Sequence, residues 1–493
     1  MRRSRLVLPT SLLVALALTA CGSNLDPSAV DRGLGAAPGS VLQQQAAVGN
    51  PGGPLIDAES GANPAPEGVP ALPPDQAAGP GTPGAPAATS APAPVEATAP
   101  GEPAPGDKRD DSGAAEAADC AGLENSTGIT DSTITIGNAS DISGPVPGLF
   151  ESSRLATTAF VKYFNDSGAT ICGRKLALKS YDSRTDASAD QQAYAAGCVE
   201  TFAMVGSMSG FDSGGAATAE KCGIPDLRAI ATTTARGDCA TCYAVQPAGS
   251  GEFQNAVPDY IKRVTGGQHA AMLYLTAGAA AENGPNQAAA GTKRGLKYVY
   301  VAGVDTGEFN YVPFVQAMKD KGVTSVQFVA AQPMFVRLVK TMEQQQFEPE
   351  LTLLDPTAYK TDFTGPGGNA AIDTVSFINF VPFEEAGSSA ELSLYLNFLQ
   401  QVRPGAEPDF FGVFAWSAAR LFVEQATKLG GDLTRASLVA SLRSVTGWTA
   451  NDLHGPMRVG DKRPPECWRF VQWSGATWQA VDGRDYHCSG TTT

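Results

Sequence analysis

The stretch Ile134-Thr135-Ile136-Gly137 begins the alternation of strand and helix patterns that decides the fold of this chain. A helix is expected after it, because apolar residues recur there at spacings of one, three and four, up to the natural C-cap Gly168. The apolar stripe consists of Leu155, Ala156, Ala159, Phe160, Tyr163 and Phe164. Strands over 176–181 and 202–206, helices over 189–200 and 215–222, and an apolar run reaching Ile230 follow. Repeated strand and helix pairs of this kind predict a parallel sheet.

A second series of the same kind begins at residue 271. Strands are expected over 271–276, 298–302, 326–330, 351–354 and 375–380, and helices over 281–295, 311–321, 334–346, 390–402 and 411–429. The tail reads as short antiparallel strands over 457–459, 468–473 and 478–481, separated by glycines. The two series predict an α/β fold with two Rossmann-like lobes. Open parallel sheets bind ligands at the carboxyl ends of their strands, so two facing sheets would share one cleft.

The N-terminus reads as a secretory signal. Arg2, Arg3 and Arg5 precede an apolar run over 6–18 that is too short for a spanning helix. The run ends in Leu18-Thr19-Ala20-Cys21-Gly22, which resembles the bacterial lipobox. We therefore expect residues 1–21 to be a lipoprotein signal with lipid on Cys21, anchoring the protein to the membrane; an ordinary cleaved signal with a chance cysteine is the alternative.

Composition separates a linker from the folded part. Residues 22–118 are rich in Pro, Ala and Gly and poor in branched apolar residues, which predicts a disordered tether. Residues 119–493 are long enough for two domains of ordinary size. The net charge is −15, and loss of the signal's arginines would make it more negative. This acidity argues against nucleic acid or anionic lipid as a partner.

Nine cysteines include Cys21, and the other eight form an even set, which in an exported chain suggests disulfides. Local spacing favours Cys198 with Cys222, Cys239 with Cys242, and Cys467 with Cys488, leaving Cys120 for Cys172, among many possible connectivities. The Cys239-Ala-Thr-Cys242 motif is alternatively redox-active, although nothing thioredoxin-like surrounds it.

The order and spacing of several motifs resemble the type I periplasmic binding proteins, in the branch of the leucine/isoleucine/valine-binding receptors of ABC importers. Over residues 128–481 the motifs are Ile134-Thr135-Ile136-Gly137, Ile142-Ser143-Gly144-Pro145, Gly173-Arg174-Lys175-Leu176, Tyr181-Asp182, Met204-Val205-Gly206-Ser207 and Gly223-Ile224-Pro225. The resemblance implies a clamshell with three crossovers, near 246–251, 379–384 and 446–455. The implied lobes are 119–248 plus about 380–446, and 249–379 plus about 447–488.

The resemblance also implies a function. We expect an extracytoplasmic, lipid-anchored monomer that binds a small amino acid-like or amide-like solute and delivers it to ABC permease subunits. A lipoprotein of the same fold that senses a ligand, or serves as a scaffold without transport, is the alternative. Sequence does not separate these two roles.

In this family the ligand's carboxylate and amino group lie on loops after the third and fourth strands of the first lobe. These loops correspond to 207–215 and 231–235, which offer Ser209, Gly210, Thr232 and Thr233. Unpaired N–H groups ahead of a helix would favour an anionic group. The alternative is simple N-capping by Asp212 or Ser213.

Aromatic and acidic residues complete the expected site. Phe211 stands where the family carries a serine cluster and is expected to line the wall, with Phe150 and Phe383 as apolar cover. In the second lobe Asp355 is expected to pair with a ligand ammonium, and Tyr359 to line the wall. Asp355 precedes Pro356, so it alternatively starts a turn.

The chain offers little for catalysis. Its three histidines, His269, His454 and His487, stand at neither nucleophile nor metal-ligand spacing. The segment 206–210 superficially suggests a nucleophile elbow but carries Met208 where serine is required. We therefore expect no enzyme activity, no cofactor and no metal.

Overall fold

The computed structural model describes residues 119–247 and 251–493. The predicted signal over 1–21, its Cys21 and the predicted tether over 22–118 lie outside the described residues.

A five-stranded parallel sheet in the order β2-β1-β3-β4-β5 forms the centre of the first lobe. Its strands are β1 (Thr133–Ser140), β2 (Lys175–Asp182), β3 (Ala203–Val205), β4 (Asp226–Ala231) and β5 (Cys242–Pro247). Every residue of β3, β4 and β5 is buried. This is the pattern of parallel strands covered by helices on both faces.

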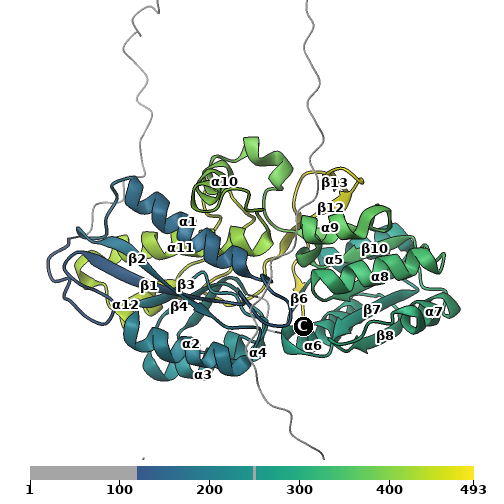
Figure 1. Cartoon of the computed structure of the whole chain (residues 1–493), viewed down its shortest axis with the longest axis horizontal. Coiled ribbons are helices and arrows are strands. Elements are labelled where there is room, and N and C mark those ends of the chain that lie inside the picture. The colour runs from purple at the N-terminus through teal and green to yellow at the C-terminus, as the bar shows by residue number, and fades with distance from the viewer. Residues whose placement is uncertain (1–118, 248–250) are drawn as a thin grey trace, which may run out of the picture. The chain divides into compact units, whose positions relative to one another are not determined.

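Helices cover both faces of this sheet (Figure 1). They are α1 (Glu151–Asp166), α2 (Ala187–Glu200), α3 (Ser213–Cys222), α4 (Thr234–Asp238), α10 (Ala390–Val402), α11 (Phe410–Leu429) and α12 (Arg435–Leu442). Helix α1 buries Ala156, Ala159, Phe160 and Phe164 of its predicted stripe. It packs on α11, whose first half is buried all round, including Trp416 against Phe160 with ring centroids 4.9 Å apart.

The second lobe is built on a larger sheet. Parallel strands β7 (Ala270–Leu275), β8 (Tyr298–Val304), β9 (Ser325–Val329), β10 (Leu351–Leu354) and β11 (Val375–Ile378) are extended by antiparallel β12 (Cys467–Trp473) and β13 (Trp478–Val481), and β14 (His487–Cys488) pairs with β12. The sheet order is β13-β12-β11-β10-β9-β7-β8. Its helices are α5 (Ala256–Thr265), α6 (Gly278–Lys293), α7 (Val312–Asp320), α8 (Gln332–Gln344) and α9 (Thr361–Gly367). Short 3₁₀ helices are η2 (Pro356–Ala358), η3 (Gly368–Ala371), η4 (Phe383–Ser388) and η5 (Gly430–Asp432).

One expected strand is absent: the prediction of a strand over 457–459 was wrong. Met457 instead pairs with Trp448 in an isolated bridge, and Arg458 pairs with Arg463 across a turn. Met457 and Val459 are both buried, which explains the alternating apolar pattern in the sequence. The backbone of this segment makes only the isolated bridges and does not form a strand.

Connecting segments run between the two lobes. Strand β5 ends at Pro247, and β6 (Phe253–Gln254) follows, paired with the C-terminal strand β15 (Thr491–Thr492). The two other connections are hydrogen-bonded to each other, Val381 N to Leu453 O at 3.0 Å and Gly455 N to Asn379 O at 2.8 Å. The predicted fold class, two parallel α/β lobes with several crossovers, is therefore confirmed.

The four disulfides of the described chain are those that spacing favoured. They join Cys120 to Cys172, Cys198 to Cys222, Cys239 to Cys242, and Cys467 to Cys488. Cys198–Cys222 links α2 to α3, and Cys467–Cys488 links paired positions of β12 and β14. Each bond thus ties segments that are already neighbours in the fold.

His454 lies buried in one of the paired connections. The Gly455 carbonyl can only accept, so His454 Nδ1 carries the hydrogen at 2.9 Å, and the neutral Nε2 accepts from the Ser417 hydroxyl at 2.8 Å. Burial lowers the pKa of His454 to about 4. The connection is therefore held by a neutral imidazole at physiological pH.

We predict an acid-sensitive contribution to stability from His454. As pH falls from about 6.5 to 4, the unfolded chain takes up a proton that the folded imidazole refuses, so this group's stabilisation, complete above pH 6.5, is lost by up to about 1.4 kcal/mol per pH unit. Urea unfolding at pH 7, 6 and 5 should show a steeper loss for the wild type than for His454→Gln. Equal slopes would contradict this assignment.

Candidate functional site

A pocket of about 540 Å³ lies where the carboxyl ends of strands from both lobes meet. From the first lobe it is lined by residues of the loops after β1, β3 and β4, and from the second by the start of α6 and the ends of β7, β9 and β10. Most of the lining is apolar: Pro145, Val146, Leu149, Phe150, Met208, Phe211, Ile230, Leu275, Met334, Phe377, Phe410, Phe411 and Trp468 are among its residues. The position is the one expected for a ligand site between open parallel sheets.

The pocket gathers most of the predicted site residues. Phe150, Gly210, Phe211, Thr232 and Asp355 line it. Their roles as ligand contacts stay predictions.

Four other predicted residues, Ser209, Thr233, Tyr359 and Phe383, do not line the pocket. Ser209 is fully buried and its Oγ accepts the Phe211 N–H at 3.1 Å, while Thr233 caps α4. Tyr359 is buried with its ring stacked on Phe383, centroids 5.3 Å apart, and its hydroxyl donates to Glu384. The side chains of Ser209, Thr233 and Tyr359 already have hydrogen-bond partners inside the protein.

The backbone donor expected to face a ligand anion holds a carboxylate of the protein itself. The Gly210 N–H donates to Asp141 Oδ2 at 2.8 Å, and Asp141 Oδ1 accepts from Ser183 Oγ at 2.6 Å and Thr185 N at 2.9 Å. Asp141 is fully buried, and this burial raises its pKa against the lowering effect of these hydrogen bonds. A ligand carboxylate at Gly210 would therefore have to displace an internal one.

The carboxylate of Asp212 likewise accepts the donors of the loop after β4. Its Oδ2 accepts the Thr232 N–H at 2.8 Å and its Oδ1 accepts the Thr233 hydroxyl at 2.6 Å. Asp212 was predicted as a possible helix N-cap, but its side chain makes no cap hydrogen bond to α3. The role of Asp141 was missed, because its partners Ser183 and Gly210 lie 42 and 69 residues away in sequence.

A buried ionic cluster supports these loops from inside the first lobe. Arg236 donates to Asp226 Oδ2 at 2.9 Å, to Asp190 Oδ2 at 3.0 Å and to the Asp212 carbonyl at 2.8 Å. Burial raises the pKa of Asp190 to about 6, opposing the influence of Arg236. Because Arg236 belongs to α4 and bonds three separate segments, the cluster fixes α4 against the sheet.

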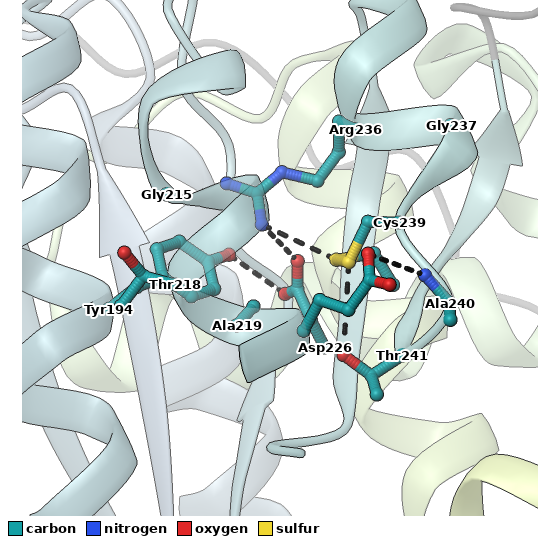
Figure 2. The surroundings of a disulfide bond; sticks show 12 residues. Tyr194, Gly215, Thr218, Ala219, Asp226, Arg236, Gly237, Cys239, Ala240 and Thr241 are labelled. Carbon is teal, nitrogen blue, oxygen red and sulfur yellow. Dashed lines mark hydrogen bonds and ion pairs between the residues drawn. A yellow bond between two sulfur atoms is a disulfide. The ribbon is translucent and has the colours of Figure 1, made fainter. Parts of the chain in front are cut away.

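The Cys239–Cys242 disulfide adjoins this cluster. Figure 2 shows the Arg236 guanidinium directed at Asp226 and at a disulfide sulfur, which is Cys242 Sγ at 3.6 Å. Each cysteine is 2% exposed, which leaves little access for a redox partner. The environment therefore favours a structural bond over the redox-active alternative.

Hydrogen bonds join the lobes beside the pocket. Ala279 N donates to Gly210 O at 2.8 Å, Asn283 Nδ2 to Thr232 O at 3.0 Å, and Thr234 N to Glu282 Oε1 at 3.0 Å. The start of α6 thus rests directly on the loops after β3 and β4. The two lobes are in contact over the pocket.

The charges in the wall are all negative. Of the described residues that line the pocket, Asp355 and Glu252 are charged, and none is Lys, Arg or His. Glu252 is paired with Arg463 at 2.5 Å. Asp355 accepts N–H groups from Thr357 at 2.8 Å and Ala330 at 3.1 Å, and burial raises its pKa to about 6.

Residues 133–477 match the family model described as "Periplasmic binding protein". The chain belongs to this family. No curated protein matches the sequence.

Solved structures show the same periplasmic binding protein fold. The fatty acid ABC transporter substrate-binding protein from Thermomonospora curvata is 17% identical, with a TM-score of 0.63 over 75% of this chain and 95% of that one. The leucine binding protein from Thermotoga maritima is 12% identical, with a TM-score of 0.61 over 73% and 99%. A solute binding protein from R. palustris in complex with benzoate is 14% identical, with a TM-score of 0.59 over 72% and 96%.

Membership of the periplasmic binding protein family assigns solute binding rather than catalysis, and a place outside the cytoplasm. Within 119–247 and 251–493, acidic, histidine and cysteine residues form no cluster suited to a metal ion. The same described residues contain no helix long and apolar enough to span a membrane.

Gly278 allows the close approach of the lobes. It has φ +57°, and a Cβ there would lie 2.6 Å from Gly210 O and 3.2 Å from the Phe211 ring. We predict that Gly278→Ala separates the lobes, which small-angle X-ray scattering would record as a larger radius of gyration than that of the wild type.

Gly266→Ala is the matched control. Gly266 has φ +71° with nothing within 4 Å of a Cβ, so it carries the same backbone strain of about 1 kcal/mol without a clash. Both variants should lose similar stability, and only Gly278→Ala should change the scattering. Identical scattering for the two variants would show that the contact does not hold the lobes together.

Proposed function

We propose that this periplasmic binding protein is the solute receptor of an ABC importer and that its solute is predominantly apolar. The observation that carries the proposal is the pocket of about 540 Å³ at the junction of the lobes, walled mainly by aliphatic and aromatic side chains. A volume of this size suits a small molecule held between two closing lobes.

The aromatic part of the wall consists of rings packed edge to face. Phe150 packs edge-on against Phe411 with centroids 4.5 Å apart, and Phe377 packs against Trp468 at 5.3 Å. Burying about 300 Å² of apolar solute surface would contribute roughly 7 kcal/mol before the costs of association. Apolar contact thus offsets a large share of the association cost, which is about 4 to 15 kcal/mol.

The geometry favours an apolar solute over an α-amino acid. Amino-acid recognition was expected to use the N–H of Gly210 and the loop at Thr232, but Asp141 and Asp212 accept those hydrogen bonds. The named ligands of the similar structures, a fatty acid transporter's substrate, leucine and benzoate, share an apolar body, which supports an apolar solute here. The amino acid-like or amide-like solute expected from the sequence stays a prediction.

The rest of the proposal concerns delivery. Lipid on Cys21 would anchor the protein, and the tether over 22–118 would hold the cleft away from the membrane. The form that docks on the permease would be the closed one, in which α6 rests on the loops of the first lobe. A bound solute would favour this form, because only there does it contact both lobes. The protein would act as a monomer.

A thermal-shift screen of the mature chain with its disulfides intact tests the proposal. We expect saturable rises in melting temperature with aliphatic and aromatic compounds and none with sugars, because a ligand at 100 times its Kd adds about 2.7 kcal/mol of stability. A panel without any stabilising compound would favour the scaffold alternative.

Phe211→Ala should raise the Kd of whichever apolar compound binds by roughly 10- to 100-fold, through loss of a wall side chain. Isothermal titration measures the change. Phe309→Ala is the matched control, since Phe309 is 74% exposed and does not line the pocket. Equal effects of the two substitutions would place the binding site elsewhere.

A further inference from the structure

The crossover strand β6, which contributes to the pocket wall, pairs with β15 in a sheet of two strands. Phe253 lies opposite Thr492, and Gln254 lies opposite Thr491. Figure 1 shows the yellow C-terminal end of the chain beside β6, and this end lies beyond residues 133–477, which match the family. Because a sheet of two strands is marginally stable by itself, other contacts must hold this pair together.

Asn255 fastens the C-terminal end of the chain to β6. Its backbone N–H donates to Gly490 O at 2.9 Å, its Nδ2 donates to Ser489 O at 3.0 Å, and its Oδ1 accepts from the Thr492 hydroxyl at 2.6 Å. Asn255 stands at the N-cap position of α5, but its side chain makes no capping hydrogen bond there. Its buried amide group serves residues 489–492 instead, which we call the tail segment.

A disulfide fixes the start of the tail segment. Cys488, which immediately precedes the segment, is bonded to Cys467 on β12. Along the segment, the Thr491 hydroxyl donates to Glu252 Oε2 at 3.2 Å, and the same carboxylate is paired with Arg463. The tail segment is therefore held covalently at its start and by hydrogen bonds along its length.

The two attachments of the tail segment lie at the two ends of a row of aromatic rings. Trp468 directly follows Cys467, and Phe253 belongs to β6. Phe377 contacts both rings, with centroids 5.3 Å from Trp468 and 6.4 Å from Phe253. All three rings line the pocket, and we call them the aromatic row. The tail segment thus ties together the two strands that carry the ends of this row.

We propose that the tail segment positions the aromatic row, with Asn255 as the positioning residue, so that solute affinity depends on residues outside the pocket lining. Neither Asn255 nor residues 489–492 line the pocket. The inference rests on the proposed function and deepens it, because it identifies what holds part of the apolar wall in place. A gap of about 0.5 to 1 Å between two atoms forfeits roughly a quarter to a half of their dispersion attraction, so small displacements of Phe253 weaken binding.

Isothermal titration with 4-phenylbutan-1-ol, a neutral apolar probe, tests the inference on the mature chain with its disulfides intact. Asn255→Ala should raise the Kd of this probe roughly 3- to 10-fold, because Phe253 is no longer held against the rest of the row. The matched control is Asn165→Ala in the first lobe. Asn165 Nδ2 donates to Leu176 O at 2.9 Å and its Oδ1 accepts from Leu176 N at 3.0 Å, and Asn165 does not line the pocket. Both variants lose two side-chain hydrogen bonds and should melt at similarly lowered temperatures, but only Asn255→Ala should change the Kd.

A double-mutant cycle with Phe253→Ala separates positioning from general damage. If Asn255 acts through the Phe253 ring, Asn255→Ala should raise the Kd by less than about twofold once residue 253 is already alanine. The same fold-change in both backgrounds would overturn the inference. An unchanged Kd in Asn255→Ala would also overturn it, and either result would leave the proposed function standing.

Hydrogen exchange tests the same attachment without a solute. The amides of β6 should exchange about tenfold faster in Asn255→Ala than in the wild type, and at the wild-type rate in Asn165→Ala. Unchanged exchange in Asn255→Ala would overturn the inference even if the wild type bound no probe, a result that would itself contradict the proposed function. If Asn255→Ala does not fold, Thr492→Val replaces it, because this variant removes one hydrogen bond to Asn255 and keeps the shape of the side chain. It should shift the Kd and the exchange in the same directions by smaller factors.

Discussion

The peptide group at Gly210 links the interior of the first lobe to the second lobe, and the cleft depends on it. On one side the N–H of Gly210 is fixed by the buried Asp141 carboxylate at 2.8 Å, and on the other its carbonyl accepts from Ala279 at the start of α6, also at 2.8 Å. The loop after β3 is therefore held in place on the first lobe at the point where the second lobe contacts it. Gly278 makes the approach possible, because a Cβ at that position would collide with the same carbonyl.

Charged side chains inside the first lobe hold the loop after β3 and its neighbours in place. Asp212 ties the loop after β3 to the loop after β4, and Arg236 ties α4 to Asp190 and Asp226. A buried ionic cluster contributes little net stability, since desolvation offsets much of its attraction. Breaking it would nevertheless leave an unpaired charge, so the cluster specifies one arrangement of the loops around an otherwise apolar pocket.

The consequence for recognition lies in the two loops of the first lobe that line the pocket. The N–H groups of Gly210 and Thr232 are held by the carboxylates of Asp141 and Asp212, so these two loops present occupied donors to the pocket. Function in this family follows the side chains at the strand ends rather than the sheets that carry them.

The sequence by itself determined the elements and their class. The stripe of α1, the buried run ending β4 and the local cysteine spacings are short-range patterns, and helices, strands and neighbouring disulfides form on the same short range. It also pointed to the loops that line the pocket, because the carboxyl ends of parallel strands always gather at one edge. What only the tertiary structure decided is how polar groups are shared there. Asp141 meets Gly210 through a hydrogen bond between residues 69 positions apart in the chain. A hydrogen bond of that kind leaves no periodic trace in sequence, so whether a loop donor faces a solute or an internal carboxylate is fixed only when the lobes are packed.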